Sequence, residues 1–405
     1  MKKNITIILF LCYLFSFSQF KKDSIKNNDL KLAALPYYSY GKGLGVTSPD
    51  SLFQLNIRFR MQNRVTYFDE EGADNRYEAQ IRRLRLRFDG YVGNPKFLYA
   101  IQLSFAPGDV GVIEEGENIN IIRDAVFFYR PNKNWNLMFG QTKLPGNRQR
   151  VNSSGALQLT DRTINNARFT LDRDFGVQVY YLHENKEKFS YNLKTSISTG
   201  EGRNWTKTSD DGVAITGKIE LFPFGSFKNN GIYFEGDILR EEKPKLLLSG
   251  AFQQNNRAVR TQGQLGEALF NPRTIRSAFL DVLLKYNGWS VMSAYMKRDA
   301  KDLITYDPDD NSNFNYVFAG AGMDYQLSYV LPSNYEIIGR FSNQKVAEEI
   351  KPYTPDSKQY SIGLTRYLWE HSFKLQTEFT LNELEYSNGS TKKNWYARFQ
   401  IEIGI

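Results

Sequence analysis

In two neighbouring stretches of the chain, arginines recur at intervals of two or four residues. The first stretch holds Arg58, Arg60 and Arg64, and the second holds Arg83, Arg85 and Arg87. In an extended chain every second side chain points to the same face, so each set would line one side of a strand. A guanidinium group keeps its charge at any accessible pH and presents a planar fork of donors that suits phosphate. Two such strands side by side predict a basic wall that attracts anions.

A structural role is the alternative for this wall. In that interpretation the arginines pair with Asp89, Asp124 and acidic residues on the opposite side of the interior. The two interpretations are compatible, because a paired arginine still contributes donors to a passing anion.

The other face of these strands is apolar. The residues that alternate with the first arginine set are Phe53, Leu55, Ile57, Phe59, Met61, Val65 and Tyr67, and only Asn63 breaks the pattern. The end of the chain repeats it with Trp395, Ala397, Phe399, Ile401, Ile403 and Ile405. Long strands with one apolar face and one charged face are typical of a transmembrane β-barrel, with lipid outside and water inside. The fold class is therefore all-β, an antiparallel transmembrane barrel.

The pattern predicts 16 strands. They lie near 52–68, 78–92, 97–105, 120–130, 135–143, 169–182, 189–199, 213–222, 245–255, 276–286, 289–298, 315–330, 335–343, 358–368, 373–386 and 394–405. Short connections alternate with longer ones, among them 256–275 and 299–314, as periplasmic turns alternate with external loops. Segment 223–244 is too long for a turn, and Gly231 to Ile238 reads as a further strand, so a count of 18 stays open. A barrel of about 16 strands encloses a water-filled lumen.

Composition and the first residues fit export to a membrane. Of 405 residues 41% are hydrophobic and the mean hydropathy is −0.50, which excludes a helical membrane protein. Residues 1–18 read as a secretory signal peptide, with Lys2 and Lys3 before an apolar core. The single cysteine, Cys12, lies in that core, and Phe10 and Leu11 are too large for a lipoprotein site. We expect an irregular lead-in over 19–50 and the barrel over 51–405, in the outer membrane of a Gram-negative bacterium.

Several short motifs follow in a fixed order. They are Gly41-Lys42-Gly43, the run from Arg82 to Gly90, Arg123-Asp124-Ala125, the run from Gly140 to Gly146, Arg173-Asp174-Phe175-Gly176-Val177-Gln178, and Ser198-Thr199-Gly200-Glu201-Gly202. Together these motifs, over residues 41–202, resemble the phosphate-selective porin O/P family, although Ser198 stands where the family usually has Asn. The resemblance implies an outer-membrane channel for small anions such as phosphate or polyphosphate, embedded in outer-membrane lipid as a homotrimer. It also adds Lys143 to the anion-guiding residues.

Loop 144–168 is the third external loop in this topology. It carries Arg148, Arg150, Arg162 and Arg168 against one acid, Asp161. In porins a loop at this position commonly folds inward, so we expect this loop to narrow the lumen and to place Arg148 and Arg150 at the constriction. A solvated external loop is the alternative.

Other functions compete with an anion porin. A general non-selective porin and a structural or assembly barrel both fit the strand pattern. An enzyme needs a nucleophile with a base, and the only histidines, His183 and His371, fall in or beside predicted periplasmic turns. Two histidines also leave little room for a metal site, and no cofactor motif is apparent. Nucleic-acid binding would explain the net charge of +8 but not the signal peptide or the two-faced strands.

Overall fold

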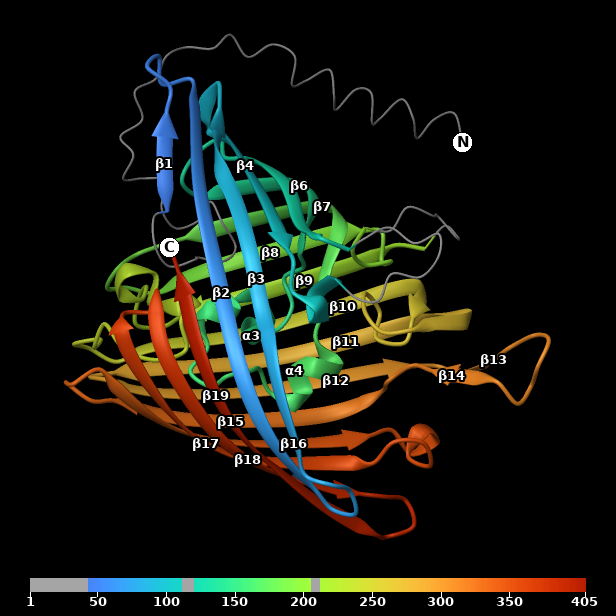
Figure 1. The fold of residues 1–405 in the computed structure, drawn as a ribbon. Helices are drawn as coiled ribbons and strands as arrows, with labels where there is room; N and C mark the ends of the chain where they lie inside the picture. Colours follow the sequence, from blue (N-terminus) through green and yellow to red (C-terminus); the bar gives the residue numbers. More distant parts are fainter. Residues whose placement is uncertain (1–42, 111–119, 205–211) are drawn as a thin grey trace, which may run out of the picture.

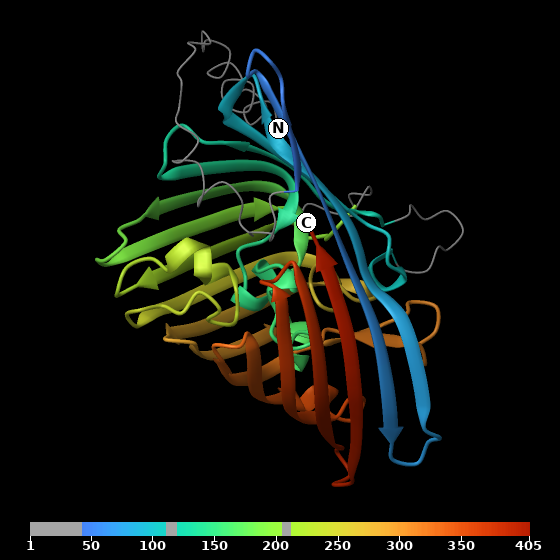
Figure 2. The same ribbon diagram turned by 60° about the vertical axis from the view of Figure 1, so that its left-hand side comes forward.

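Sixteen antiparallel strands close into a barrel (Figures 1 and 2). The computed structural model describes residues 43–110, 120–204 and 212–405. The predicted signal peptide, residues 1–18, and most of the lead-in lie outside the described residues. The barrel strands are β2 (Phe53–Glu70), β3 (Arg76–Val92), β4 (Asn94–Ser104), β5 (Ile122–Tyr129), β6 (Trp135–Lys143), β7 (Arg173–His183), β8 (Ser190–Ser198), β9 (Ala214–Phe222), β10 (Lys245–Arg260), β11 (Ala268–Tyr286), β12 (Trp289–Ala300), β15 (Gly320–Val330), β16 (Tyr335–Val346), β17 (Asp356–Trp369), β18 (Phe373–Glu385) and β19 (Thr391–Gly404).

Each strand pairs with its neighbour along the chain, and the last pairs with the first. β19 runs antiparallel to β2, from Asn394 opposite Glu70 to Gly404 opposite Arg60. This closure satisfies the backbone donors and acceptors that a sheet edge would leave unpaired in lipid. The predicted fold class and the count of 16 are confirmed.

The open alternative of 18 strands is excluded. Throughout residues 223–244, all of which the structure describes, there is a short 3₁₀ segment, η2 (Lys228–Tyr233), and no strand. Asn229 and Asn230 have positive φ angles of 44° and 62°, which an extended strand does not allow. The prediction of a strand from Gly231 to Ile238 is therefore wrong.

Two strands reach further into an external connection than the sequence indicated. β10 continues to Arg260 and β11 begins at Ala268, so the predicted loop 256–275 shrinks to 261–267. The backbone pairs persist through irregular registers at Asn255, Ala258 and Arg260. These irregularities break the alternation of apolar and polar residues that the prediction used. In connection 301–319, β13 (Ile304–Tyr306) and β14 (Phe314–Tyr316) form a separate hairpin.

Four residues of the expected irregular lead-in form strand β1 (Leu44–Thr47). β1 pairs with Gln54–Ile57 of β2, just beyond the point where β19 stops. It therefore covers a stretch of β2 edge that the closing strand leaves open.

The two faces of the barrel differ as the alternation predicts. Large apolar side chains on the outside are exposed, with Leu280 and Ile362 each at 59%. The side chains that point inward are mostly polar or charged, and many are buried because chain segments enter the lumen. No helix in the described part of the chain is long and apolar enough to cross a membrane.

We call the two ends of the barrel the turn end and the loop end. The turn end holds Gly404 and short turns such as Asn287–Gly288, and the loop end holds connections such as 261–267 and 301–319. The left side of Figure 1 shows the turn end, near the mark for the C-terminus.

Candidate functional site

Residues 144–172, which we call the inward loop, lie inside the barrel (Figure 1). The loop contains α3 (Arg148–Val151), η1 (Ser154–Ala156) and α4 (Ile164–Phe169). Ser153 and Thr163 cap η1 and α4, each accepting a hydrogen bond from a backbone N–H two or three residues later. These caps satisfy backbone groups that an irregular segment in the lumen would otherwise leave without partners.

Several wall strands hold the inward loop in place. On β18, Lys374 Nζ donates to the carbonyl oxygens of Gly155 (2.9 Å) and Leu157 (2.6 Å). On β16, Arg340 donates to the carbonyl oxygen of Asp161 at 3.0 Å. At the base of the loop, Leu144, Phe169 and Leu171 pack with apolar residues of β11 and β12, including Phe279 and Met296. The loop therefore narrows the lumen.

A glycine at position 155 allows the inward loop to approach the wall closely. A Cβ atom there would lie 2.7 Å from Arg60 Nη1 and 2.7 Å from Glu402 Oε1. The tip of the loop therefore packs directly against charged groups of β2 and β19. This contact brings loop hydroxyls within reach of the arginines.

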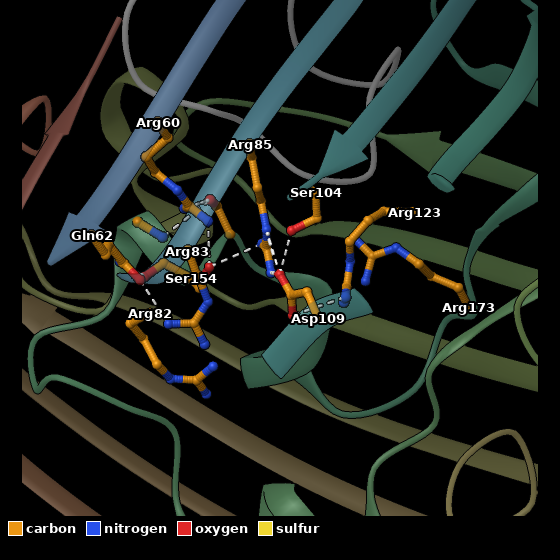
Figure 3. Close-up of polar contacts among 12 residues, drawn as sticks. Arg60, Gln62, Arg82, Arg83, Arg85, Ser104, Asp109, Arg123, Ser154 and Arg173 are labelled. Carbon is orange, nitrogen blue, oxygen red and sulfur yellow. Dashed lines mark hydrogen bonds and ion pairs between the residues drawn. The ribbon is translucent and has the colours of Figure 1, made fainter. Parts of the chain in front are cut away.

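The predicted arginines of β2 and β3 do form one wall of the lumen (Figure 3). Arg58 lies opposite Arg87, and Arg60 lies opposite Arg85, in the register of the two strands. Lys143 lies opposite Arg173 where β6 and β7 meet the inward loop. The row of cations thus extends over several neighbouring strands.

Asp161 of the inward loop gathers three of these arginines. Its carboxylate accepts hydrogen bonds from Arg64 at 3.1 Å, Arg82 at 2.9 Å and Arg83 at 3.3 Å. The sequence pattern missed Arg82, because strict alternation puts it on the outer face. A register shift between Gln62 and Asn63 explains the difference: two residues of β3 oppose one step of β2, and both reach inward.

Asp109, in the connection that follows β4, forms a second junction. It lies in α2 (Pro107–Val110) and binds Arg85 at 2.6 Å and Arg123 at 2.9 Å, while Ser104 donates to it at 2.6 Å (Figure 3). Arg85 also donates to Ser154 of the inward loop at 3.2 Å.

Arg123 and Arg173 are site residues that sequence reasoning did not select. Arg173 binds both oxygens of Asp124, at 3.1 Å each. A register shift near Gln102 turns both Arg123 and Asp124 toward the lumen, where alternation predicts only one. The sequence feature that could identify these two residues is the pair of Arg-Asp motifs, Arg123-Asp124 and Arg173-Asp174, which also contribute to the family resemblance.

A cavity of about 60 Å³ lies between this wall and the inward loop, near the turn end. Its charged lining consists of six cations, Arg58, Arg60, Arg85, Arg87, Lys143 and Arg173, and one carboxylate, Glu402. Asp89 compensates in part by binding Arg58 at 3.2 Å and Arg87 at 3.0 Å. The arrangement presents several fixed positive charges within one small, partly enclosed space.

The nine predicted site residues fall into three groups. Arg58, Arg60, Arg85, Arg87 and Lys143 line the cavity, and Arg64 and Arg83 bind Asp161 instead. Arg148 points away from the cavity and donates to the carbonyl oxygens of Ile232 (2.7 Å) and Phe234 (2.6 Å). Arg150 forms an ion pair with Asp172 of the same loop. The structure thus does not bring Arg148 and Arg150 into the cavity.

Removing the Asp161 charge should loosen the constriction. We expect Asp161→Asn to destabilise the barrel by about 2 kcal/mol, because three clustered arginines lose their shared partner. Thermal unfolding in detergent, followed by circular dichroism, should show a midpoint lowered by a few degrees, and single-channel recordings should become noisier. Asp310→Asn, in the exposed tip after β13, is the matched control and should leave both unchanged. An unaltered midpoint and noise for Asp161→Asn would contradict this role.

The effect of Asp161→Asn should also depend on pH. Burial by itself raises the pKa of the Asp161 carboxyl, but Arg82, Arg83 and Arg64 hold that pKa well below its usual range. A carboxyl in the unfolded chain has a pKa of about 3.9. Because the folded pKa is lower, the stabilisation is fully present above about pH 5 and is lost as the pH falls toward the folded value. The difference between wild type and variant should therefore narrow in acid.

Within residues 43–110, 120–204 and 212–405, no group of three or more His, Cys, Asp or Glu side chains could hold a metal ion. The side chains of the basic wall and the inward loop therefore act through fixed charges and hydrogen-bond donors.

Comparison with solved structures shows the same fold at low sequence identity. The outer membrane channel DcaP of Acinetobacter baumannii aligns with a TM-score of 0.54 and 12% identity, over 89% of this chain and 99% of that one. OmpF of Salmonella typhi aligns with a TM-score of 0.56 and 11% identity, over 89% and 100%. An anion-selective porin from Comamonas acidovorans gives 0.52 and 11%, over 87% and 99%. These likenesses show that the chain has the same barrel fold as these proteins.

A search of curated proteins found no match. Residues 53–219 match the sequence model of the family described as phosphate-selective porin O and P. That range contains β2 to β8 and most of β9, with the basic wall and the inward loop. Through residues 53–219 the chain is therefore similar to the phosphate-selective porin O and P family.

Proposed function

We propose that this protein is a passive porin for small anionic solutes in the outer membrane of a Gram-negative bacterium. The observation that carries the proposal is the cavity beside the inward loop, with six cationic side chains and one carboxylate in its lining. The match of residues 53–219 to the porin family model supports a channel in the outer membrane. By the family resemblance we also propose a homotrimer.

The geometry suits weak, repeated contact with anions. An anion that enters the narrowed lumen loses water contacts and gains charge-assisted hydrogen bonds from guanidinium groups. The arginines of β2 and β3 stand in a row along the wall, so the anion passes from one to the next rather than settling in one deep site. Pairing with Asp89, Asp109 and Asp161 moderates the field and favours release.

The same pairing supports a second candidate, a general non-selective porin. In it, Asp89, Asp109 and Asp161 would neutralise the wall, and small solutes of either sign would pass. The two candidates differ in ion preference, which bilayer recordings measure.

Phosphate is the solute class that the resemblance favours, and it should interfere with chloride. In planar bilayers, phosphate added at constant ionic strength should reduce the chloride current severalfold, since its oxygens accept several hydrogen bonds at once. Acetate, which has one carboxylate and a lower charge, is the control anion and should reduce it much less. Equal effects of phosphate and acetate would argue for a channel without phosphate preference.

A further inference from the structure

The connection between β9 and β10, residues 223–244, enters the barrel from the turn end. We call it the turn-end insert; Figure 2 shows it in lime at the mouth of the barrel. Short turns such as Asn287–Gly288 suffice elsewhere at this end. Several of the insert's side chains are buried, with Glu235 and Asp237 at 1% exposure and Phe234 at 3%. A segment that only joined two strands would not bury charged groups inside the lumen.

The wall strands β11 and β12 fix the insert through its backbone. Lys285 Nζ donates to the carbonyl oxygens of Gly231 at 2.8 Å and Gly236 at 2.7 Å. Ser290 Oγ donates to the carbonyl oxygen of Glu235 at 2.6 Å. Phe222, Phe227, Leu247 and Leu283 form an apolar cluster under it. The insert is therefore a built part of the lumen.

The insert also joins the inward loop. The Glu235 carboxylate accepts hydrogen bonds from Gln149 Nε2 at 3.0 Å and from the backbone N–H of Gln158 at 3.1 Å. The backbone N–H of Glu235 donates to the carbonyl oxygen of Ala156 at 3.2 Å. Arg148 completes the junction through the carbonyl oxygens of Ile232 and Phe234. This explains why Arg148 points away from the basic cavity.

The two segments together divide the lumen. The insert lies along the wall from β9 to β16, where Gly236 approaches Glu336. At the far side of the insert, the Phe234 ring stacks on the His371 ring, with 5.0 Å between the ring centroids. His371 also lines the basic cavity, whose other wall residues come from β2, β3, β4, β6, β7 and β19. The insert also shares a small cavity with Asn136 of β6 and Tyr180 of β7, so the insert and the basic cavity both reach these two strands. Elsewhere they face different wall strands, and they meet at His371.

We propose that the turn-end insert is a selectivity element that closes the part of the lumen beside β9 to β16 and confines the solute path to the side of the basic cavity. This inference rests on the proposed function. The wall that the insert contacts carries charges of both signs, Lys285 under Gly231 and Gly236 and Glu336 beside Gly236. A path along that wall would discriminate poorly between anions and cations. Covering it leaves solutes only the side where cations predominate.

Replacing residues 223–244 by a short Asn-Gly turn tests this proposal. We expect a folded barrel whose single-channel conductance is about 1.6-fold higher, since the insert lies along six of the 16 barrel strands, from β9 to β16. The ratio of anion to cation permeability should fall toward one. The same replacement of residues 304–316, the β13–β14 hairpin at the loop end, is the matched control and should change neither quantity.

A second variant keeps the chain length in case the shortened protein does not assemble. Phe234→Ala with Glu235→Ala removes the ring stack and the contacts to Gln149 and Gln158, and should raise conductance in the same direction. Unchanged conductance in either folded variant would overturn the proposal. The role of the insert and the proposed anion preference are tested by different measurements. The conductance of the variants tests the role of the insert, and the reversal potential of the wild type tests the anion preference.

Discussion

Changing Arg58, Arg60 and Arg87 together to glutamine is expected to abolish most of the preference for anions. These three residues line the cavity and reach inward from β2 and β3. Glutamine keeps the polarity and approximate length of each side chain but removes its charge. The remaining lining would hold Arg85, Lys143 and Arg173 against Glu402, with Asp89 released from its two partners. The local field would therefore become nearly balanced.

The expected size follows from Coulomb's law. A unit charge about 6 Å from the solute contributes about 0.7 kcal/mol in bulk water, so three charges contribute about 2 kcal/mol. That difference corresponds to a local anion concentration about thirtyfold lower at low salt, so the anion-to-cation ratio should fall by at least this factor. At about 1 M salt the Debye length falls to about 3 Å, and the difference between variant and wild type should nearly vanish.

The matched control changes three arginines outside the cavity. Arg76, Arg273 and Arg276 lie toward the loop end of β3 and β11, where Arg76 binds Glu70 and Arg276 contacts Gln254. Their replacement by glutamine removes the same charge and should leave the ratio close to that of the wild type. If the cavity variant assembles normally and keeps the wild-type ratio at low salt, its arginines are structural. Equal losses in both variants would assign the preference to net charge instead.

Deleting Phe399 to Ile405 should prevent the barrel from forming. This segment pairs with β18 on one side and with β2 on the other. It also carries Glu402, which accepts from Gln62 at 2.7 Å and pairs with Lys374 at 3.4 Å. Each backbone group left unpaired in lipid costs several kcal/mol, so the effect should be all-or-none. The shortened protein should lose the heat-dependent shift in gel migration that marks a folded barrel.

A control for this deletion lies in the connection just before β19. Removing Asn388 and Gly389 from the exposed turn shortens the chain but leaves the pairs of β19 in place. That variant should still shift on heating. Normal insertion of the protein that lacks Phe399 to Ile405 would show that β19 does not close the barrel.

The strands could be predicted from the sequence because each strand faces lipid on one side and water on the other. An apolar face toward lipid and a polar face toward the lumen produce an alternation that persists through β2 and β19, and all 16 predicted strands are present. The ends of β10 and β11 were less accurate, because irregular registers interrupt the alternation there. β1 was missed because its residues, Leu44–Thr47, are too few to show a period.

The site could be predicted only in part. Alternation placed Arg58, Arg60, Arg85 and Arg87 on the lumenal face, and they do line one cavity. It could not place Arg82 or Arg123, since register shifts turn neighbouring residues to the same side.

The sequence pattern could not identify the acidic partners of the site arginines, for a different reason. Asp109 and Asp161 come from connections whose path through the lumen has no local sequence signal. For the turn-end insert, the sequence indicates only that residues 223–244 are too long for a turn and does not predict that they enter the lumen.

The reversal potential of the wild-type channel in a KCl gradient at low salt tests the central claim most directly. Purified protein in a planar bilayer should give a potential of the sign set by chloride, and the variant lacking the Arg58, Arg60 and Arg87 charges should move it toward zero. A wild-type potential at zero, or of the sign set by potassium, would contradict the account of this barrel as an anion-preferring porin.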